Sequence, residues 1–416
     1  MINSRIGELK KERLFTFLIV LMAWANTYNL PWASIGVGEF LLIICIPFYY
    51  KKNTNFSLNF FENGFVLWFV YVIFLTLILF NLLDAHISKF LLLARESFYW
   101  IVIFILGKNL FNLKYFKKMI LAFAVLLSIF IIVQSVVYSI SGYLIPGFFL
   151  NAPLKDGGLT GMEMYERYLQ LAKWYGFARP NGFLCEPAHC SQFLFVCLLC
   201  FIMDSTKSFA KKNALILLIS IAMLMTFSTT GIALLFFSWF IYIIVEKRLS
   251  YFRIPVAFLF ILSVIVLVCG MVNVGNNAID RIVNIFDGKD IDGSSNVRLN
   301  NGLKLFMELP MIMKLFGTGM GMFDYVSSYL SFEDVNSYMN TFSIVLFMSG
   351  FCGFFIWNIS LVVMFIKSSL LGKSLVVGFF LMTLGCSIFC QAQMVWIFLI
   401  ILADIEQKKM RFRNNE

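Results

Sequence analysis

Long apolar runs, separated by short polar connections, cover this chain from end to end. Most runs approach the roughly 20 residues that an α-helix needs to cross a bilayer. The pattern predicts an all-α polytopic membrane protein in which residues 1–416 form a single transmembrane domain. We expect about 12 transmembrane helices, at about 14–31, 35–50, 63–83, 88–106, 119–144, 187–203, 214–229, 231–246, 254–273, 338–366, 374–389 and 394–405.

The last two apolar runs are short, and the connection between them has only a few residues. A single re-entrant element is the alternative to two crossings in this part of the chain. The tail that follows is basic, with Lys408, Lys409, Arg411 and Arg413, which favours two crossings.

Composition agrees with a membrane protein, because 60% of the residues are hydrophobic and 13% are charged, whereas soluble domains have about one quarter charged. The net charge of +10 does not indicate nucleic-acid binding, since Lys and Arg are scattered over short loops and form no single basic face. Basic loops remain in the cytoplasm. Their alternation predicts that both termini are cytoplasmic.

Metal and cofactor chemistry are not indicated by the pattern of ligating residues. Cys197 and Cys200 have metal-like spacing within an apolar run, but no histidine or second cysteine pair lies nearby. Asp290 and Asp292 resemble the metal ligands of soluble enzymes that use sugar nucleotides, but they are expected outside the membrane, where such nucleotides are absent. We expect no metal and no cofactor.

Two connections, at about 145–186 and 274–337, are much longer than the others and are expected on the periplasmic side. Long loops in a compact protein are usually functional or disordered. Aromatic residues in the first and helix-like apolar spacing in the second predict that both are ordered. Pro310 is expected to divide the helix of the second loop into two parts.

The first periplasmic loop ends in a polar cluster at the start of an expected span. Its sequence is Arg179-Pro-Asn-Gly-Phe-Leu-Cys-Glu-Pro-Ala-His189, which combines a cation, a carboxylate and one of two histidines. Glu186 and Arg179 are candidates for chemistry on an anionic substrate. The alternative is an Arg–Glu pair at the membrane surface that only holds the loop.

Further candidates for anion binding lie elsewhere in the chain. The second loop offers Arg281, Arg298 and a glycine-rich turn from Gly317 to Gly321, whose backbone N–H groups could approach an anion. Arg95 lies within an expected span beside Glu96, where charged side chains usually face a cavity or a partner. Snorkelling of Arg95 toward the membrane surface is the competing interpretation.

Taken in order along about 90–366, these motifs resemble the Wzy-type O-antigen polymerase and O-antigen ligase superfamily. The resemblance rests on Arg179-x-x-Gly182-x-x-x-Glu186-Pro187, Ser228-Thr-Thr-Gly231, Arg298 with Gly317-x-Gly319-x-Gly321, and Asn340 with Gly350-x-x-Gly353.

The resemblance implies a GT-C-like, inverting and metal-independent glycosyltransferase in the bacterial inner (plasma) membrane. Its substrate would be an undecaprenyl-pyrophosphate-linked oligosaccharide, with membrane lipids around it and a chain-length regulator as a further partner. On this hypothesis the pyrophosphate is held by Arg179, Arg298, Arg281 and Arg95, while Gly317 and Gly319 also bind substrate. Glu186 accepts the proton of the attacking hydroxyl, His189 assists it, and Tyr338 and Asn340 bind sugar hydroxyls.

Two alternatives stay open. Family ligases carry a His-Asn pair eleven residues before the first glycine of the Gly-x-x-Gly motif, whereas here Met339 and Asn340 precede Gly350. The missing histidine favours a polymerase over a ligase. A flippase for the lipid-linked oligosaccharide is the other alternative, although secondary transporters usually show internal repeats.

Overall fold

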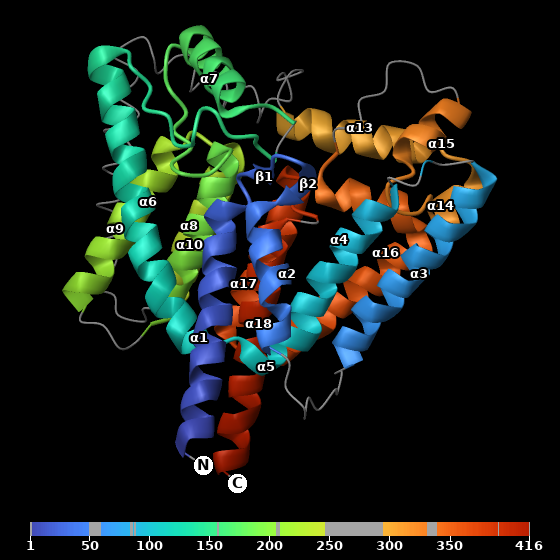
Figure 1. The fold of residues 1–416 in the computed structure, drawn as a ribbon, viewed down its shortest axis with the longest axis horizontal. Coiled ribbons are helices and arrows are strands. Elements are labelled where there is room, and N and C mark those ends of the chain that lie inside the picture. The colour runs from blue at the N-terminus through green and yellow to red at the C-terminus, as the bar shows by residue number, and fades with distance from the viewer. Residues whose placement is uncertain are drawn as a thin grey trace. The chain divides into compact units, whose positions relative to one another are not determined.

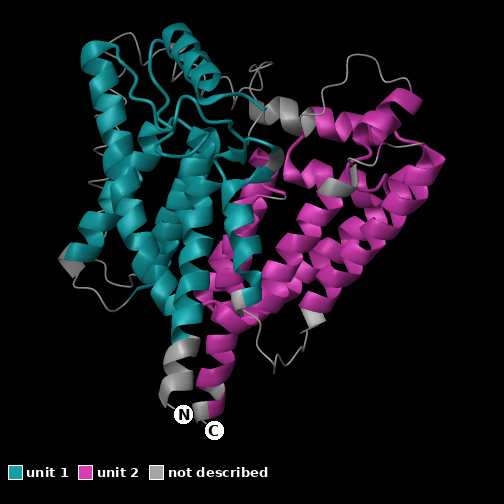
Figure 2. Ribbon diagram, viewed as in Figure 1, with its two compact units in different colours: residues 1–50, 112–290 teal, residues 51–111, 291–416 magenta. Residues whose placement is uncertain are grey.

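The computed structural model describes residues 2–49, 60–83, 86, 89–155, 158–204, 209–245, 294–330, 339–389 and 391–415. The chain divides into two compact units, each assembled from two separate stretches of sequence (Figure 2). The first unit contains Met1–Tyr50 and Asn112–Asp290. The second contains Lys51–Phe111 and Ile291–Glu416.

The first unit is built of helices, which Figure 1 labels along the chain. They are α1 (Ile2–Ala25), α2 (Val37–Tyr49), α6 (Leu113–Ser141), α7 (Gly161–Tyr175), α8 (Pro187–Ile202), α9 (Phe209–Met225) and α10 (Thr229–Val245). The expectation of an all-α chain needs one amendment, because β1 (Asn29–Leu30) and β2 (Ala33–Gly36) pair as a short antiparallel hairpin between α1 and α2.

The second unit is also helical among the residues described. Its elements are α3 (Phe60–Leu82), α4 (Lys89–Ile101), the π-helix η1 (Val102–Gly107), α5 (Lys108–Leu110), α13 (Ser294–Glu308), α14 (Met311–Phe316), α15 (Phe323–Tyr329), α16 (Thr341–Lys367), α17 (Leu370–Gly385) and α18 (Ala392–Asn415). Pro310 separates α13 from α14 as predicted, since it is the N-cap residue of α14.

The helices agree with a membrane protein in length and composition. Among the described residues, three are long and apolar enough to cross a bilayer: Glu62–Leu82, Leu113–Ser141 and Thr341–Lys367. Shorter apolar helices occupy Val37–Pro47, Pro187–Ile202, Thr229–Val245 and Leu370–Gly385. The expected span at 254–273 lies outside the described residues, and the total of twelve crossings stays a prediction.

Polar side chains of α18 hold the turn between α16 and α17. The Asp404 carboxylate accepts hydrogen bonds from the Ser369 backbone N–H at 2.9 Å and from its hydroxyl at 2.6 Å. Lys408 donates to the carbonyl oxygens of Lys367 and Ser368 at 3.2 and 2.9 Å. One helix therefore caps the start of α17 and the end of α16 together.

The opposite end of α17 is held in the same manner. The Thr341 hydroxyl, at the start of α16, accepts from the backbone N–H groups of Ile388 and Phe389 at 2.7 and 3.1 Å. Because its two ends contact opposite ends of α16, α17 runs antiparallel to that helix. Two separate helices, α17 and α18, therefore occupy the last part of the chain, and two membrane crossings there stay a prediction.

A buried ion pair joins the 145–186 loop to α2 within the first unit. The Lys155 ammonium lies 2.7 Å from the Glu39 carboxylate, and their side chains are 8% and 3% exposed. The second carboxylate oxygen of Glu39 accepts the Gly36 backbone N–H at 2.9 Å, while the Glu39 N–H donates to Asn26 at 3.0 Å. Buried charges are tolerated when they are paired and hydrogen-bonded in this way.

We expect Lys155→Met to destabilise the protein by roughly 3–5 kcal/mol, because it leaves the Glu39 charge buried without its partner. The double variant Glu39→Gln with Lys155→Met should recover most of that loss, since neither charge remains. Thermal unfolding of the purified protein in nanodiscs measures both effects, with Lys173→Met, an exposed lysine on α7, as control. Equal losses in the single and double variants would contradict a stabilising role of the pair.

Candidate functional site

The 145–186 loop packs its apolar side chains in two clusters, together with residues outside the loop. One cluster contains Tyr28, Phe148, Leu154, Met164 and Cys185, and a second contains Leu144, Ala172 and Ala178. Both clusters include residues of α7, which therefore packs its apolar face inward on the loop. Within the described residues of this loop, Gly161–Tyr175 form a helix.

A capping box fixes where α7 begins. The Thr160 hydroxyl accepts the Glu163 backbone N–H at 3.4 Å, and the Glu163 carboxylate accepts the Thr160 backbone N–H at 2.7 Å. Hydrogen bonds from the Thr160 backbone and hydroxyl lower the pKa of the Glu163 carboxyl below its ordinary value. This reciprocal pair satisfies two N–H groups that a helix start leaves open.

The segment between Arg179 and Glu186 forms a tight turn against α6. The Leu184 N–H donates to the Asn181 carbonyl at 3.1 Å, and the Asn181 amide returns a bond to the Leu184 carbonyl at 2.8 Å. Gly182 adopts a positive φ of 58°, and a Cβ atom there would overlap Leu127 of α6. Only glycine fits a backbone that lies so close to a helix.

The candidate carboxylate and histidine stand at the start of α8, directly after this turn. Glu186 is the N-cap residue, and its side chain makes no capping hydrogen bond. Pro187 occupies the first helical position, where the missing N–H costs nothing. Arg179, Glu186 and His189 are all half-buried, and the segment that contains them leads directly into α8.

The start of α10 lies beside the start of α8. Gly231 in the first turn of α10 is so close to Ser191 that a Cβ atom would collide with the serine side chain. The Ser191 hydroxyl lies 2.8 Å from the Thr226 hydroxyl, at the end of α9. Because both helices begin here, their partially positive N-terminal ends lie together near the Arg179–His189 segment.

Aromatic contacts hold the loop on this helical scaffold. The Phe177 ring lies 4.6 Å from that of Phe227, centroid to centroid, in the turn between α9 and α10. Phe183 stacks on Phe130 of α6 at 4.4 Å. Trp174, in contrast, is 72% exposed and takes no part in the loop core.

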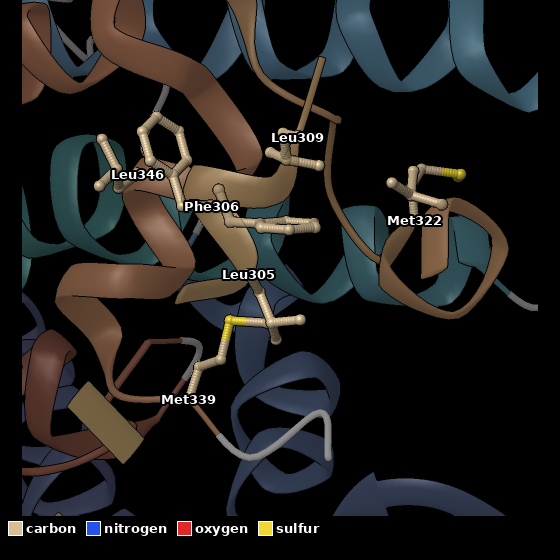
Figure 3. Close-up of a cluster of buried hydrophobic side chains, with 8 residues drawn as sticks. Leu305, Phe306, Leu309, Met322, Met339 and Leu346 are labelled. Atoms are coloured by element: carbon tan, nitrogen blue, oxygen red, sulfur yellow. The ribbon is translucent and has the colours of Figure 1, made fainter. Parts of the chain in front are cut away.

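In the second unit, α13 packs on α16 through the apolar cluster drawn in Figure 3. Its buried side chains are Leu305, Phe306, Leu309, Met322, Val326, Met339, Leu346 and Phe347. Gly302 lies directly against Ser343 of α16. With 3.6 residues per turn, position 298 falls one turn before Gly302 on the same face of α13.

The glycine-rich turn from Gly317 to Gly321 fits into a break in α16. Gly350 has non-helical angles (φ 59°, ψ −171°), which interrupt the helical ladder. The carbonyl oxygens of Phe347 and Met348 accept the backbone N–H groups of Thr318 and Gly319 at 3.1 and 2.9 Å.

Neighbouring amides of the same turn are also engaged. The Met320 N–H donates to the Thr76 hydroxyl of α3 at 2.8 Å, and the Gly317 N–H donates to Met313 at 2.7 Å. These bonds give the turn a packing role, whereas substrate binding by Gly317 and Gly319 stays a prediction.

Asn340 is the N-cap of α16 and is fully buried. Its side-chain oxygen accepts the Ser343 N–H at 2.8 Å, and its amide nitrogen donates to the Leu384 carbonyl at 2.6 Å. The structure therefore gives Asn340 a helix-capping role that the sequence analysis did not predict. Sugar binding by this amide would require it to exchange these two partners.

The remaining candidates divide into described and undescribed residues. Arg95 is half-buried on α4, and Glu96 beside it is fully buried. Arg281 and Tyr338 lie outside the described residues, as do Asp290 and Asp292. Within the described ranges, no group of three or more His, Cys, Asp or Glu side chains is arranged to hold a metal ion.

The sequence analysis missed Gln134, which donates to Ile145 and accepts from Gly182. One feature could have drawn attention to it, because it is a glutamine within one of the most apolar runs of the chain. Polar residues inside membrane spans are costly and are usually functional or structural contacts.

Comparison of the sequence with models of known protein families and with curated proteins gave no match.

Two glycines with similar backbone angles make a matched test of the packed turn. Gly142 (φ 69°) has open space at its Cβ position, whereas a Cβ on Gly319 (φ 75°) would lie 2.8–2.9 Å from Thr76. Alanine at either site incurs a left-handed backbone strain of about 1–2 kcal/mol. Gly319→Ala should lose about 1–3 kcal/mol more through overpacking, measured by equilibrium unfolding in mixed micelles. Equal losses for both variants would show that the close contact contributes nothing.

Proposed function

We propose that this chain is a polysaccharide polymerase of the Wzy type, which joins undecaprenyl-pyrophosphate-linked oligosaccharide repeats at the outer face of the bacterial plasma membrane. The observation that supports the proposal is the Arg179–His189 segment, which runs into the beginning of α8 and contains an arginine, a glutamate and a histidine within eleven residues. The order of its residues, Arg-x-x-Gly followed by Glu-Pro, is that of the superfamily it resembles.

The electrostatics around this segment support an anionic substrate. An arginine fork binds phosphate oxygens in a bidentate manner and keeps its charge at every physiological pH. The N-terminal ends of α8 and α10 add partial positive charge on the same side of the first unit. A diphosphate near these groups would be stabilised most when its charge grows, as it does when it leaves the sugar.

In the proposed reaction the acceptor hydroxyl attacks the anomeric carbon of the donor sugar. A new glycosidic C–O bond forms, and the bond between that carbon and the pyrophosphate oxygen breaks with inversion. Glu186 accepts the hydroxyl proton, and undecaprenyl pyrophosphate leaves with the bonding electron pair. Arg179 holds the diphosphate, while His189 assists Glu186. Roles for Arg298, Arg281 and Arg95 are what the family resemblance implies.

The surroundings of Met339 support a polymerase over a ligase. This position corresponds to the histidine of the ligase His-Asn pair, and here the methionine is 5% exposed within the apolar cluster of α13 and α16. A buried thioether used for packing cannot accept a proton as a histidine would. The neighbouring Asn340 is committed to capping α16.

Arg179→Ala and Glu186→Gln should each lower polymerisation at least about 100-fold, which is the usual effect of removing a general base or a charge-stabilising donor. Cells would then carry a single repeat unit on each lipopolysaccharide core, seen as a collapsed ladder on a gel. Arg167→Ala and Glu166→Gln are matched controls, because both residues are exposed on α7 of the same loop. Normal ladders in both site variants, at normal protein levels, would refute the proposed function.

The same variants separate a polymerase from a flippase. A polymerase defect leaves single lipid-linked repeats on the outer leaflet, where an added glycan-modifying enzyme can reach them in intact spheroplasts. A flippase defect leaves them on the inner leaflet and protected. Protection of the accumulated repeats would therefore favour transport over polymerisation.

Metal removal gives an independent test of the proposed chemistry. Because guanidinium groups are expected to stabilise the leaving diphosphate, EDTA should leave the rate of polymerisation in proteoliposomes unchanged. The substrate is a synthetic lipid-linked repeat, and the elongated products are counted on a gel. A rate that falls with EDTA and returns with Mg²⁺ or Mn²⁺ would contradict the arginine-based mechanism.

A further inference from the structure

Gln134 lies in the middle of the first unit and is fully buried on α6. Its amide nitrogen donates to the Ile145 carbonyl at 2.8 Å and lies 3.5 Å from the Asn181 side-chain oxygen. Its oxygen accepts the Gly182 backbone N–H at 2.9 Å. One side chain therefore binds the beginning and the end of the first periplasmic loop.

The orientation of the amide is fixed by these partners. A backbone N–H can only donate and a backbone carbonyl can only accept, so the oxygen of Gln134 must face Gly182 and its nitrogen must face Ile145. No aliphatic side chain of the same size can make both bonds. An amide in this position is also costly without partners, because the helix around it is apolar and water is scarce.

In the sequence, the hydrogen bond that Gly182 donates to Gln134 lies between Arg179 and Glu186. Gly182 follows Arg179 by one short turn and precedes Glu186 by another. Its backbone is pressed against α6, and Gly147 near the start of the loop is so close that a Cβ atom there would collide with the Gly182 carbonyl oxygen. The path of the chain from the guanidinium to the carboxylate is thus determined where Gln134 binds it.

We infer that Gln134 is a positioning residue that closes the first periplasmic loop and fixes Arg179 relative to Glu186. This inference rests on the proposed function for its catalytic consequence, but not for its structural one. Losing the amide would free the turn while leaving the apolar contacts of α6 in place. The two reacting groups would then sample geometries that place the diphosphate and the attacking hydroxyl less well.

The test is hydrogen–deuterium exchange on the full-length protein in nanodiscs, followed by mass spectrometry of the peptide that covers 179–186. In Gln134→Met the Gly182 amide should exchange about 10–100-fold faster, because a buried donor loses its acceptor. Gln134→Glu retains an oxygen toward Gly182 and should keep most of the protection. Ser139→Ala is the matched control, since that hydroxyl bonds only the Ser135 carbonyl of its own helix.

Unchanged exchange in Gln134→Met, or faster exchange spread evenly over all helices, would overturn the inference.

The catalytic consequence is measured on the same proteins with a synthetic lipid-linked repeat as substrate. We expect kcat to fall about 10–100-fold in Gln134→Met with a smaller change in KM, and to recover in Gln134→Glu. Normal kcat despite a released turn would also overturn the positioning role. A wild-type protein that does not polymerise would refute the proposed function alone, because the exchange result still decides whether Gln134 holds the loop.

Discussion

A polar group inside an apolar helical bundle must find its hydrogen-bond partner within the protein, because a bilayer core contains no water to replace it. In this chain the rule explains where the helices are joined. Asp404 and Lys408 cap both sides of one turn, and Thr341 caps the opposite end of the same helix pair. Each polar side chain bonds backbone groups at a helix end or in the connection that follows it. The result is a set of connections that can be short and still well defined.

The same constraint explains how the 145–186 loop is held in place. Its charged residue Lys155 is buried against Glu39, and its backbone is bound by a glutamine of α6. These are strong contacts in an environment of low dielectric, where electrostatic interactions are less screened than in water. A loop tied down at several points can present side chains from a rigid base. For a group-transfer reaction, that rigidity matters more than the number of residues that could touch the substrate.

The positions of the helices could be predicted from the sequence because helices in lipid need long apolar runs with charged residues at their ends, and this pattern is easy to recognise. The hairpin at Asn29–Gly36 and the π-helix η1 could not, since neither follows from the pattern of apolar and charged residues. Asn340 was expected to bind sugar, yet its position caps a helix, and single-sequence analysis cannot tell a polar residue that faces substrate from one that faces Leu384. The cluster from Arg179 to His189 was recognisable because its members are close in sequence, whereas Gln134 is far from the residues it holds.

The glycine-rich turn fits two interpretations from its sequence, a phosphate-binding loop and a turn that packs closely against a helix. A sequence such as Gly317-x-Gly319-x-Gly321 is compatible with a phosphate cradle, but it is equally what a turn needs when it enters the break that Gly350 makes in α16. Here the amides of Thr318 and Gly319 already donate to carbonyl oxygens of that helix. An anion would have to displace these bonds, and each such exchange offers little net gain because one hydrogen bond replaces another. The negative charge on a leaving diphosphate is therefore stabilised better by guanidinium groups, which carry a full positive charge that a backbone amide does not.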